Sequence, residues 1–160
     1  MTDTTGAASA ASDPAPSEPA PSDTVRFDTK VAVVLREGLA PWQELNVTAF
    51  LLSGIATSEP GLVGEPYEDA DGQTYLPMLR QPVLVHLADA TVLQTVRAKA
   101  VERGIVPAVY TADLFSTGHD AANRAAVRAV AGADLDLVGV AVRGPRNAVD
   151  RMLKPARLHP

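Results

Sequence analysis

The chain has 160 residues, of which 46% are hydrophobic and none is cysteine. This length suffices for one domain with a packed core, and the lack of cysteine excludes disulfides, thiolate metal sites and a cysteine nucleophile. The formal net charge is −5, but four acids precede the first base, Arg26, and the remainder carries 15 acids against 14 bases. Because a near-neutral domain lacks the basic excess that grips a phosphate backbone, we expect no nucleic-acid partner.

Residues 1–25 consist almost entirely of Ala, Ser, Thr, Pro, Asp and Glu. Such a segment cannot bury enough apolar surface to offset the entropy of ordering, which predicts a disordered tail before a single α/β domain at residues 26–160. This tail does not have the basic and apolar segments of a secretory leader, and no apolar run approaches the ~20 residues that span a bilayer. We therefore expect a cytoplasmic protein without a membrane partner.

Residues 30–57 carry the clearest strand–turn–helix signal of the chain. The valine-rich run at residues 30–36 predicts a strand that is buried on both faces. Gly38 ends this run, and Pro41 has a backbone angle suited to the first turn of a helix. Apolar or small side chains recur at positions 42, 45, 49, 52 and 56, which predicts a helix that continues to Thr57.

The Gly- and Pro-rich segment that follows contains a turn signal at residues 70–73, which predicts a small hairpin between residues 67–69 and 75–76. Residues 82–87 form the second predicted core strand. Asp89 or Thr91 can cap the next helix, which runs to about Arg103 before Gly104 ends it.

Three further elements and a short helix complete the chain. The pattern predicts a third strand at residues 105–110, a helix at about 120–131, a fourth strand at 135–142 and a last short helix at about 147–153. Strands that alternate with helices of this length indicate an α/β layered fold around a four-stranded sheet.

The sequence offers little for familiar catalytic or cofactor chemistry. The three histidines have no metal-ligand spacing, and the glycines form neither a dinucleotide fingerprint nor a phosphate-binding loop. The chain also has no Gly-x-Ser-x-Gly elbow. We therefore predict no metal site and no cofactor.

Two polar groups remain as candidates for a site. One lies on the first helix, where Gln43, Asn46, Ser53 and Thr57 share a face with Trp42 and Phe50. An exposed helix face would also explain its polar members. The other group follows the third strand and comprises Thr111, Asp113, Thr117, His119, Asp120 and Asn123. A network of helix caps and turns would also explain it.

The two groups would meet if the first and third strands were parallel neighbours, because open α/β sheets bind ligands at the carboxyl ends of their strands. The helix start near Asp120 would then favour an anionic ligand group, although Asp113 and Asp120 would oppose it. The sequence thus predicts one groove for a small polar molecule, lined by Trp42, Asn46, Thr111, Asp113, His119 and Asn123.

Several fragments resemble one uncharacterised bacterial family, the domain-of-unknown-function family numbered two thousand. They are Lys30–Arg36, Trp42-Gln-Glu-Leu-Asn46-Val, Glu65-Pro-Tyr67, Leu79-Arg-Gln-Pro82, Tyr110-Thr111, Gly118-His119-Asp120 and Arg143-Gly-Pro-Arg-Asn147. The resemblance extends over about residues 30–159. It implies the fold of type II peptidyl-tRNA hydrolases, a three-layer α/β/α sandwich with a mixed four-stranded sheet. It also implies an antiparallel fourth strand, which would place Arg143–Asn147 at the edge opposite the predicted groove.

The site of those hydrolases has no clear counterpart in this chain. Aligning residues 45–49 with the start of the family's first helix places Asn46 where the hydrolases carry a lysine. An amide does not supply the positive charge of that lysine, so hydrolysis of peptidyl-tRNA by this route is expected to be weak or absent.

Two classes of function follow from these observations. The first is a small-molecule-binding or regulatory protein that uses the predicted groove. The second is a hydrolase or transferase acting on a small polar substrate, in which His119 acts as acid and base while Asn46 and Thr111 position the substrate. Neither class requires a cofactor, and both leave self-association open.

Overall fold

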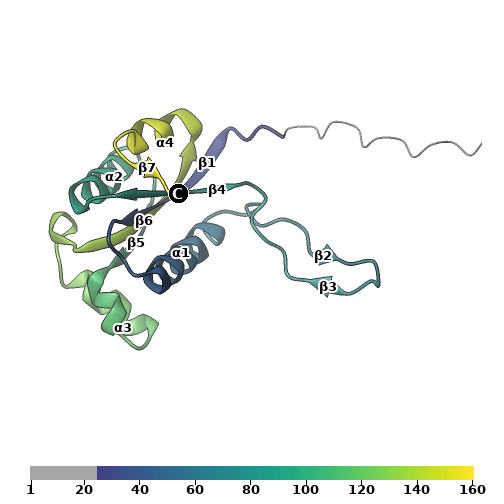
Figure 1. Ribbon diagram of the computed structural model, residues 1–160, viewed down its shortest axis with the longest axis horizontal. Helices are drawn as coiled ribbons and strands as arrows, with labels where there is room; N and C mark the ends of the chain where they lie inside the picture. The colour runs from purple at the N-terminus through teal and green to yellow at the C-terminus, as the bar shows by residue number, and fades with distance from the viewer. Residues whose placement is uncertain (1–24) are drawn as a thin grey trace, which may run out of the picture.

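The structure is a computed structural model that describes residues 25–160, so nearly all of the predicted tail lies outside the described residues. Its elements are β1 (Thr29–Arg36), α1 (Pro41–Ala56), β2 (Tyr67–Glu68), β3 (Thr74–Tyr75), β4 (Val83–Ala88), α2 (Ala90–Glu102), β5 (Ala108–Thr111), α3 (Asp120–Arg128), β6 (Leu137–Pro145), α4 (Arg146–Leu153) and β7 (Arg157–Leu158) (Figure 1). Two 3₁₀ helices, η1 (Ala112–Ser116) and η2 (Gly132–Asp134), flank α3.

A mixed five-stranded sheet in the order β5-β6-β1-β4-β7 forms the middle of the fold. β1 and β4 are parallel, whereas β6 runs antiparallel to both β1 and β5. The fourth predicted strand, β6, thus has the antiparallel direction that the family resemblance implies. The prediction of four strands is wrong, because β7 adds a fifth strand that pairs Leu158 with His86 at the edge. Two residues are too few to show a strand pattern in sequence.

Helices cover both faces of this sheet. α1 lies on one face and packs Val47, Leu51 and Ile55 against β1 and β6. α2 and α4 lie on the other face, where Leu93 and Met152 join a second core cluster. This arrangement explains why the middle of β1, residues 31–34, is fully buried and apolar at every position.

Local sequence signals set most element ends. Pro41 is the first residue of α1, and the Asp89 side chain caps α2 by accepting a bond of 2.8 Å from the Val92 amide. The third strand begins at Ala108 rather than at residue 105, because Pro107 offers no amide to a strand ladder. α3 ends at Arg128, three residues before the predicted end.

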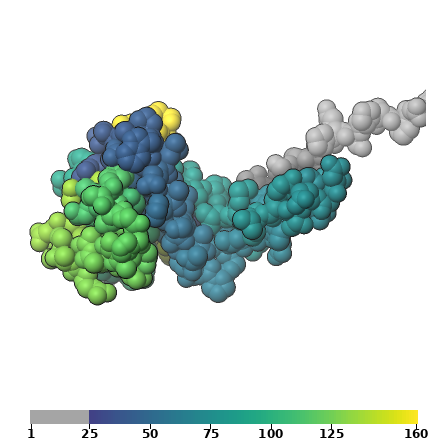
Figure 2. All heavy atoms as spheres, turned by 90° about the horizontal axis from the view of Figure 1, so that it is seen from below, coloured from purple at the N-terminus to yellow at the C-terminus, as the bar shows by residue number. Residues whose placement is uncertain are grey.

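The predicted hairpin is present as β2 and β3, which pair only with each other. We call residues 65–77, which include this hairpin, the arm; the arm projects from the rest of the molecule (Figures 1 and 2). At its base the Gly64 amide donates to the Met78 carbonyl at 2.9 Å, and Val63 pairs with Leu79. Within residues 25–160, none of the helices has the length and apolar character to cross a bilayer.

Candidate functional site

A cavity of about 540 Å³ lies between α1, the end of β5, η1 and the start of α3. We call it the α1–α3 cavity. β1 and β5 run in the same direction with β6 between them, so their carboxyl ends lie on the same side of the sheet although they are not neighbours. The condition that the first and third strands be neighbours is not met, but both strands run in the same direction, which brings their carboxyl ends to one side of the sheet.

Aromatic side chains form one wall of this cavity. Trp42 meets Phe115 edge-on with ring centroids 5.7 Å apart, and Phe50 meets Tyr110 in the same way at 5.9 Å. Tyr110 and Phe115 are 5.2 Å apart and connect the two pairs. The whole chain has seven aromatic residues, and four of them line this one cavity.

Asn46 and Tyr110 join the aromatic wall to a polar edge. The Asn46 amide donates to the Tyr110 hydroxyl at 3.2 Å. Burial raises the pKa of Tyr110, and the bond from Asn46 acts in the opposite direction. The phenol therefore stays protonated at neutral pH and keeps its own hydrogen for donation.

His119 is the N-cap residue of α3, and its Nδ1 accepts a bond of 3.3 Å from the Ala122 amide. An accepting Nδ1 places the ring hydrogen of the neutral imidazole on Nε2. The amides of Ala122 and Asn123 also bond to the His119 carbonyl. Two amides at the start of α3 therefore already have partners within the chain. This end of the helix would bind an anion less well than the sequence alone indicates.

The remaining polar groups of the cavity are also held in place. The Thr117 hydroxyl contacts both the Asn123 side chain and the Leu114 carbonyl. Asp120 forms an ion pair with Arg124 at 2.7 Å, one helical turn away. No Lys or Arg lies among the residues that line this cavity, as far as the described chain goes. The cavity therefore suits a neutral or cationic ligand better than an anionic one.

Four of the six side chains proposed from sequence line this cavity: Trp42, Asn46, His119 and Asn123. Thr111 does not, because it is fully buried in β5 while Tyr110, one residue earlier, fills the α1 face of the sheet. Asp113 is exposed on η1 and also lies outside the lining.

Sequence reasoning missed Tyr110 and Phe115 as site residues. Tyr110 is the last residue of a predicted strand, and Phe115 lies in a segment without periodicity, so the sequence pattern marks neither as a site residue. The one available signal was the position of Tyr110 directly before the polar group. Among residues 25–160, no three His, Asp or Glu side chains are grouped as metal ligands would be.

A layered α/β protein with an aromatic and amide-lined cavity is the class that this geometry defines. The profile of the family "Protein of unknown function (DUF2000)" matches residues 29–160, and the chain belongs to that family. Among solved structures, the chain is similar to the protein of unknown function Atu0240 from Agrobacterium tumefaciens strain C58. The two share 44% identity over 84% of this chain and 100% of that chain, with a TM-score of 0.81. A comparison with curated proteins finds no match.

Proposed function

We propose that this protein binds a small, flat, polar molecule in the α1–α3 cavity and acts as a binding or regulatory protein. The observation that carries the proposal is the convergence of four of the chain's seven aromatic rings on one cavity. Aromatic faces and edges bind planar rings, and a few fixed polar groups set their orientation. A ligand with a conjugated ring and hydrogen-bonding edges meets both requirements.

The polar groups support a neutral or cationic ligand. Asn46 supplies a carbonyl oxygen that can accept, and the Nε2 hydrogen of His119 can donate. The aromatic rings also attract cations through their faces. Asp120 lies at the cavity and would oppose an anion.

Catalysis by His119 has less support from the same contacts. An acid–base histidine is usually oriented by an acceptor on one nitrogen while the other faces the substrate. Here Nδ1 is occupied by the Ala122 amide, and the neighbouring Asp120 pairs with Arg124 instead. A hydrolase or transferase therefore remains the alternative to a binding protein.

From the resemblance to type II peptidyl-tRNA hydrolases, this proposal takes the fold and not the activity. The antiparallel β6 and the helices on both faces are compatible with that fold. Asn46 stands at the expected lysine position, and it donates to Tyr110. We therefore expect no turnover of peptidyl-tRNA comparable to that of a true hydrolase.

The sole tryptophan of the chain, Trp42, lines the cavity and gives a direct test. We would titrate the full chain with adenine, uracil, nicotinamide and tyramine and follow tryptophan fluorescence. Saturable quenching by at least one ring compound, and none by ribose, is the expected result. No saturable change with any ring compound at millimolar concentration would contradict the proposal.

Single substitutions distinguish a loss of binding at the α1–α3 cavity from a general effect on the fold. Asn46→Ala should weaken binding of the active compound roughly three- to tenfold, as expected for one lost neutral hydrogen bond. His119→Ala would also remove the cap of α3, so His119→Asn is preferred, because it retains an N-cap acceptor while removing the imidazole. Asn147→Ala at the far end of the sheet is the matched control and should bind normally. Equal affinity in all three variants would place the ligand elsewhere.

A further inference from the structure

Two sequence fragments that the α1–α3 cavity does not use meet at the opposite end of the sheet. Arg80 and Gln81 precede β4, and Arg143 lies near the end of β6. Because β6 is antiparallel to β1, Arg143 pairs with Val31 near the start of β1. These side chains line a cavity of about 250 Å³ together with Phe27, Thr29, Pro60, Gly61 and Leu62. We call it the arginine cavity.

Arg143 is only partly satisfied at this position. Its side chain is 20% exposed and its Nη1 pairs with Glu59 at 2.5 Å. Its Nε is buried and has no hydrogen-bond partner among the described residues. A guanidinium carries five N–H donors, and a single carboxylate that is itself 57% exposed leaves most of them available. Arg143 also lines a second cavity of about 500 Å³.

Backbone contacts fix the position of Arg80 in the lining of the arginine cavity. The Arg80 amide donates to the Leu62 carbonyl at 2.9 Å. Its side-chain stem crosses Gly64 so closely that a Cβ at Gly64 would lie 3.1 Å from the Arg80 Cγ. Arg80 is exposed as a residue and does not belong to either core cluster.

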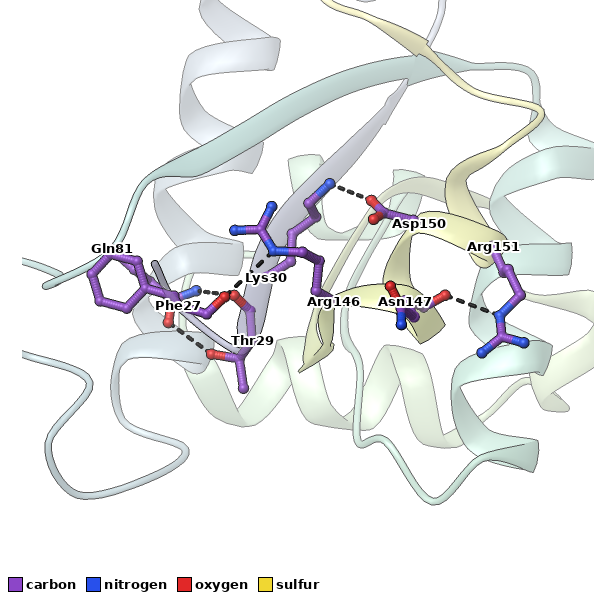
Figure 3. A network of polar contacts seen from close by, with 8 residues as sticks. All are labelled: Phe27, Thr29, Lys30, Gln81, Arg146, Asn147, Asp150 and Arg151. Carbon is purple, nitrogen blue, oxygen red and sulfur yellow. Dashed lines mark hydrogen bonds and ion pairs between the residues drawn. The ribbon is translucent and has the colours of Figure 1, made fainter. Parts of the chain in front are cut away.

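A rigid polar wall closes the arginine cavity on the sheet side. The Thr29 hydroxyl donates to Gln81 Oε1 at 2.9 Å, and Gln81 Nε2 donates back to the Thr29 carbonyl at 3.4 Å. Figure 3 shows this pair beside Phe27, whose carbonyl accepts a bond of 3.4 Å from Arg146 Nε. Gln81 is 8% exposed and is therefore fixed before any ligand arrives.

We propose that the arginine cavity binds an oxyanion, the phosphate or carboxylate of a small molecule, between Arg80 and Arg143. Guanidinium forks match the oxygen spacing of both groups and form strong, charge-assisted bonds. The residues that line this cavity include two arginines and, within the described chain, no acid. Glu59 pairs with Arg143 in this structure, and the ligand would compete with Glu59 for that guanidinium. This proposal does not rest on a ligand in the α1–α3 cavity.

Calorimetric titration of the full chain with inorganic phosphate and, separately, with acetate tests this site. We expect saturable binding of at least one of the two anions, and the one that binds shows whether the site takes phosphate or carboxylate. Arg80→Gln and Arg143→Gln should each weaken that binding roughly tenfold or more, as expected for a lost charged hydrogen bond. Arg151→Gln, a change of the same charge on α4, should leave it unchanged.

The Glu59→Gln variant separates a ligand site from a structural ion pair. If Glu59 competes with the anion, its removal should tighten anion binding severalfold. Asp150→Asn removes an equal charge at the same end of the sheet, where Asp150 pairs with Lys30, and serves as the control. A Glu59→Gln variant that binds no tighter than Asp150→Asn would overturn the proposal. The absence of saturable anion binding would also overturn it, as would an equal loss of anion affinity in the Arg80→Gln and Arg151→Gln variants. Should Arg143→Gln fail to fold, the exposed Arg80 and Glu59 still decide the question.

Discussion

At the scale of single residues, two histidines near the β4–β7 edge titrate with opposite effects on stability. Burial lowers the pKa of His86 below its ordinary value of 6.5, and the charge of Lys30 acts in the same direction. The pKa of His159 is raised by its bond with the Pro160 carbonyl and by its contact with Glu44 at 3.4 Å. His86 therefore favours the neutral ring in the folded state, whereas His159 favours the charged one.

The contribution of His86 should appear on acidification. His86 binds a proton more readily in the unfolded chain than in the folded one. Its contribution to the free energy of unfolding is therefore fully present above about pH 6.5 and is lost as the pH falls below that value. We expect His86→Leu to lose less unfolding free energy than the wild type between pH 7 and pH 5, as measured by urea unfolding. Parallel curves for the two proteins over this range would show that His86 does not titrate in this way.

The contribution of His159 has the opposite sign. His159 binds a proton more tightly in the folded chain than in the unfolded one. Its contribution to the free energy of unfolding is therefore fully present below about pH 6.5 and disappears as the pH rises through the raised pKa of His159. His159→Gln should therefore remove part of the decline in stability between pH 6 and pH 8. His119→Asn is a suitable control, since it replaces another histidine away from this edge. An unchanged pH profile in His159→Gln would contradict the assignment.

At the scale of elements, two glycines lie where α1 packs on the sheet, and only one of them is required there. β6 carries Gly139 beneath α1, where a Cβ would lie 2.5 Å from Val47 Cγ1 and 2.9 Å from Leu51 Cδ1. Gly54 lies within α1 itself, and a Cβ there would meet only the Ala108 Cβ at an ordinary 3.5 Å. Gly139 is required because α1 approaches the sheet too closely there for a side chain, whereas Gly54 only weakens the helix that contains it.

The same substitution should therefore have opposite effects at these two glycines. Gly139→Ala should lower the free energy of unfolding by about 1–3 kcal/mol, because α1 must move away from the sheet. Gly54→Ala should raise it by about 0.5–1 kcal/mol through helix propensity and lower entropy of the unfolded chain. Urea unfolding of both variants checks the pair. Two changes of the same sign would show that the spacing of α1 and β6 is set elsewhere.

At the scale of the whole molecule, the arm stands apart from the two packed faces. Its large apolar side chains point into solvent, and Leu76 is 86% exposed. Its two strands belong to a separate sheet of their own. The arm therefore adds little buried apolar area to the fold.

Removing the arm should leave the rest of the fold intact. Gly64 and Met78 already form a backbone hydrogen bond, so a two-residue Asn-Gly turn can replace residues 65–77. We expect this shortened chain to melt within about two degrees of the full chain, followed by circular dichroism. A decrease of many degrees would mean that the arm packs on the body in solution.

The molecule also separates its two candidate sites by the direction of one strand. Because β6 runs against β1 and β5, its end lies opposite their carboxyl ends. The α1–α3 cavity and the arginine cavity thus share no lining residue. Loss of ligand binding at one should leave binding at the other unaffected.

Sequence alone determined the features that depend on neighbouring residues. The valine run of β1, the proline that starts α1 and the Asp89 cap of α2 act within one or two turns of the chain. The rule that parallel strands bind ligands at their carboxyl ends also indicates Trp42, Asn46, His119 and Asn123 as candidates for one groove, because it holds for strands that run in the same direction even with another strand between them.

Tertiary structure decided what depends on contacts between distant segments. β7 exists only because β4 offers it an edge, and a two-residue strand has no pattern of its own. The aromatic wall forms because α1, β5 and η1 bring Trp42, Tyr110 and Phe115 together. Arg80 and Arg143 line one cavity only after β6 inserts antiparallel between β1 and β5. Chain periodicity reports which face of an element is buried, but it does not report which other element covers that face.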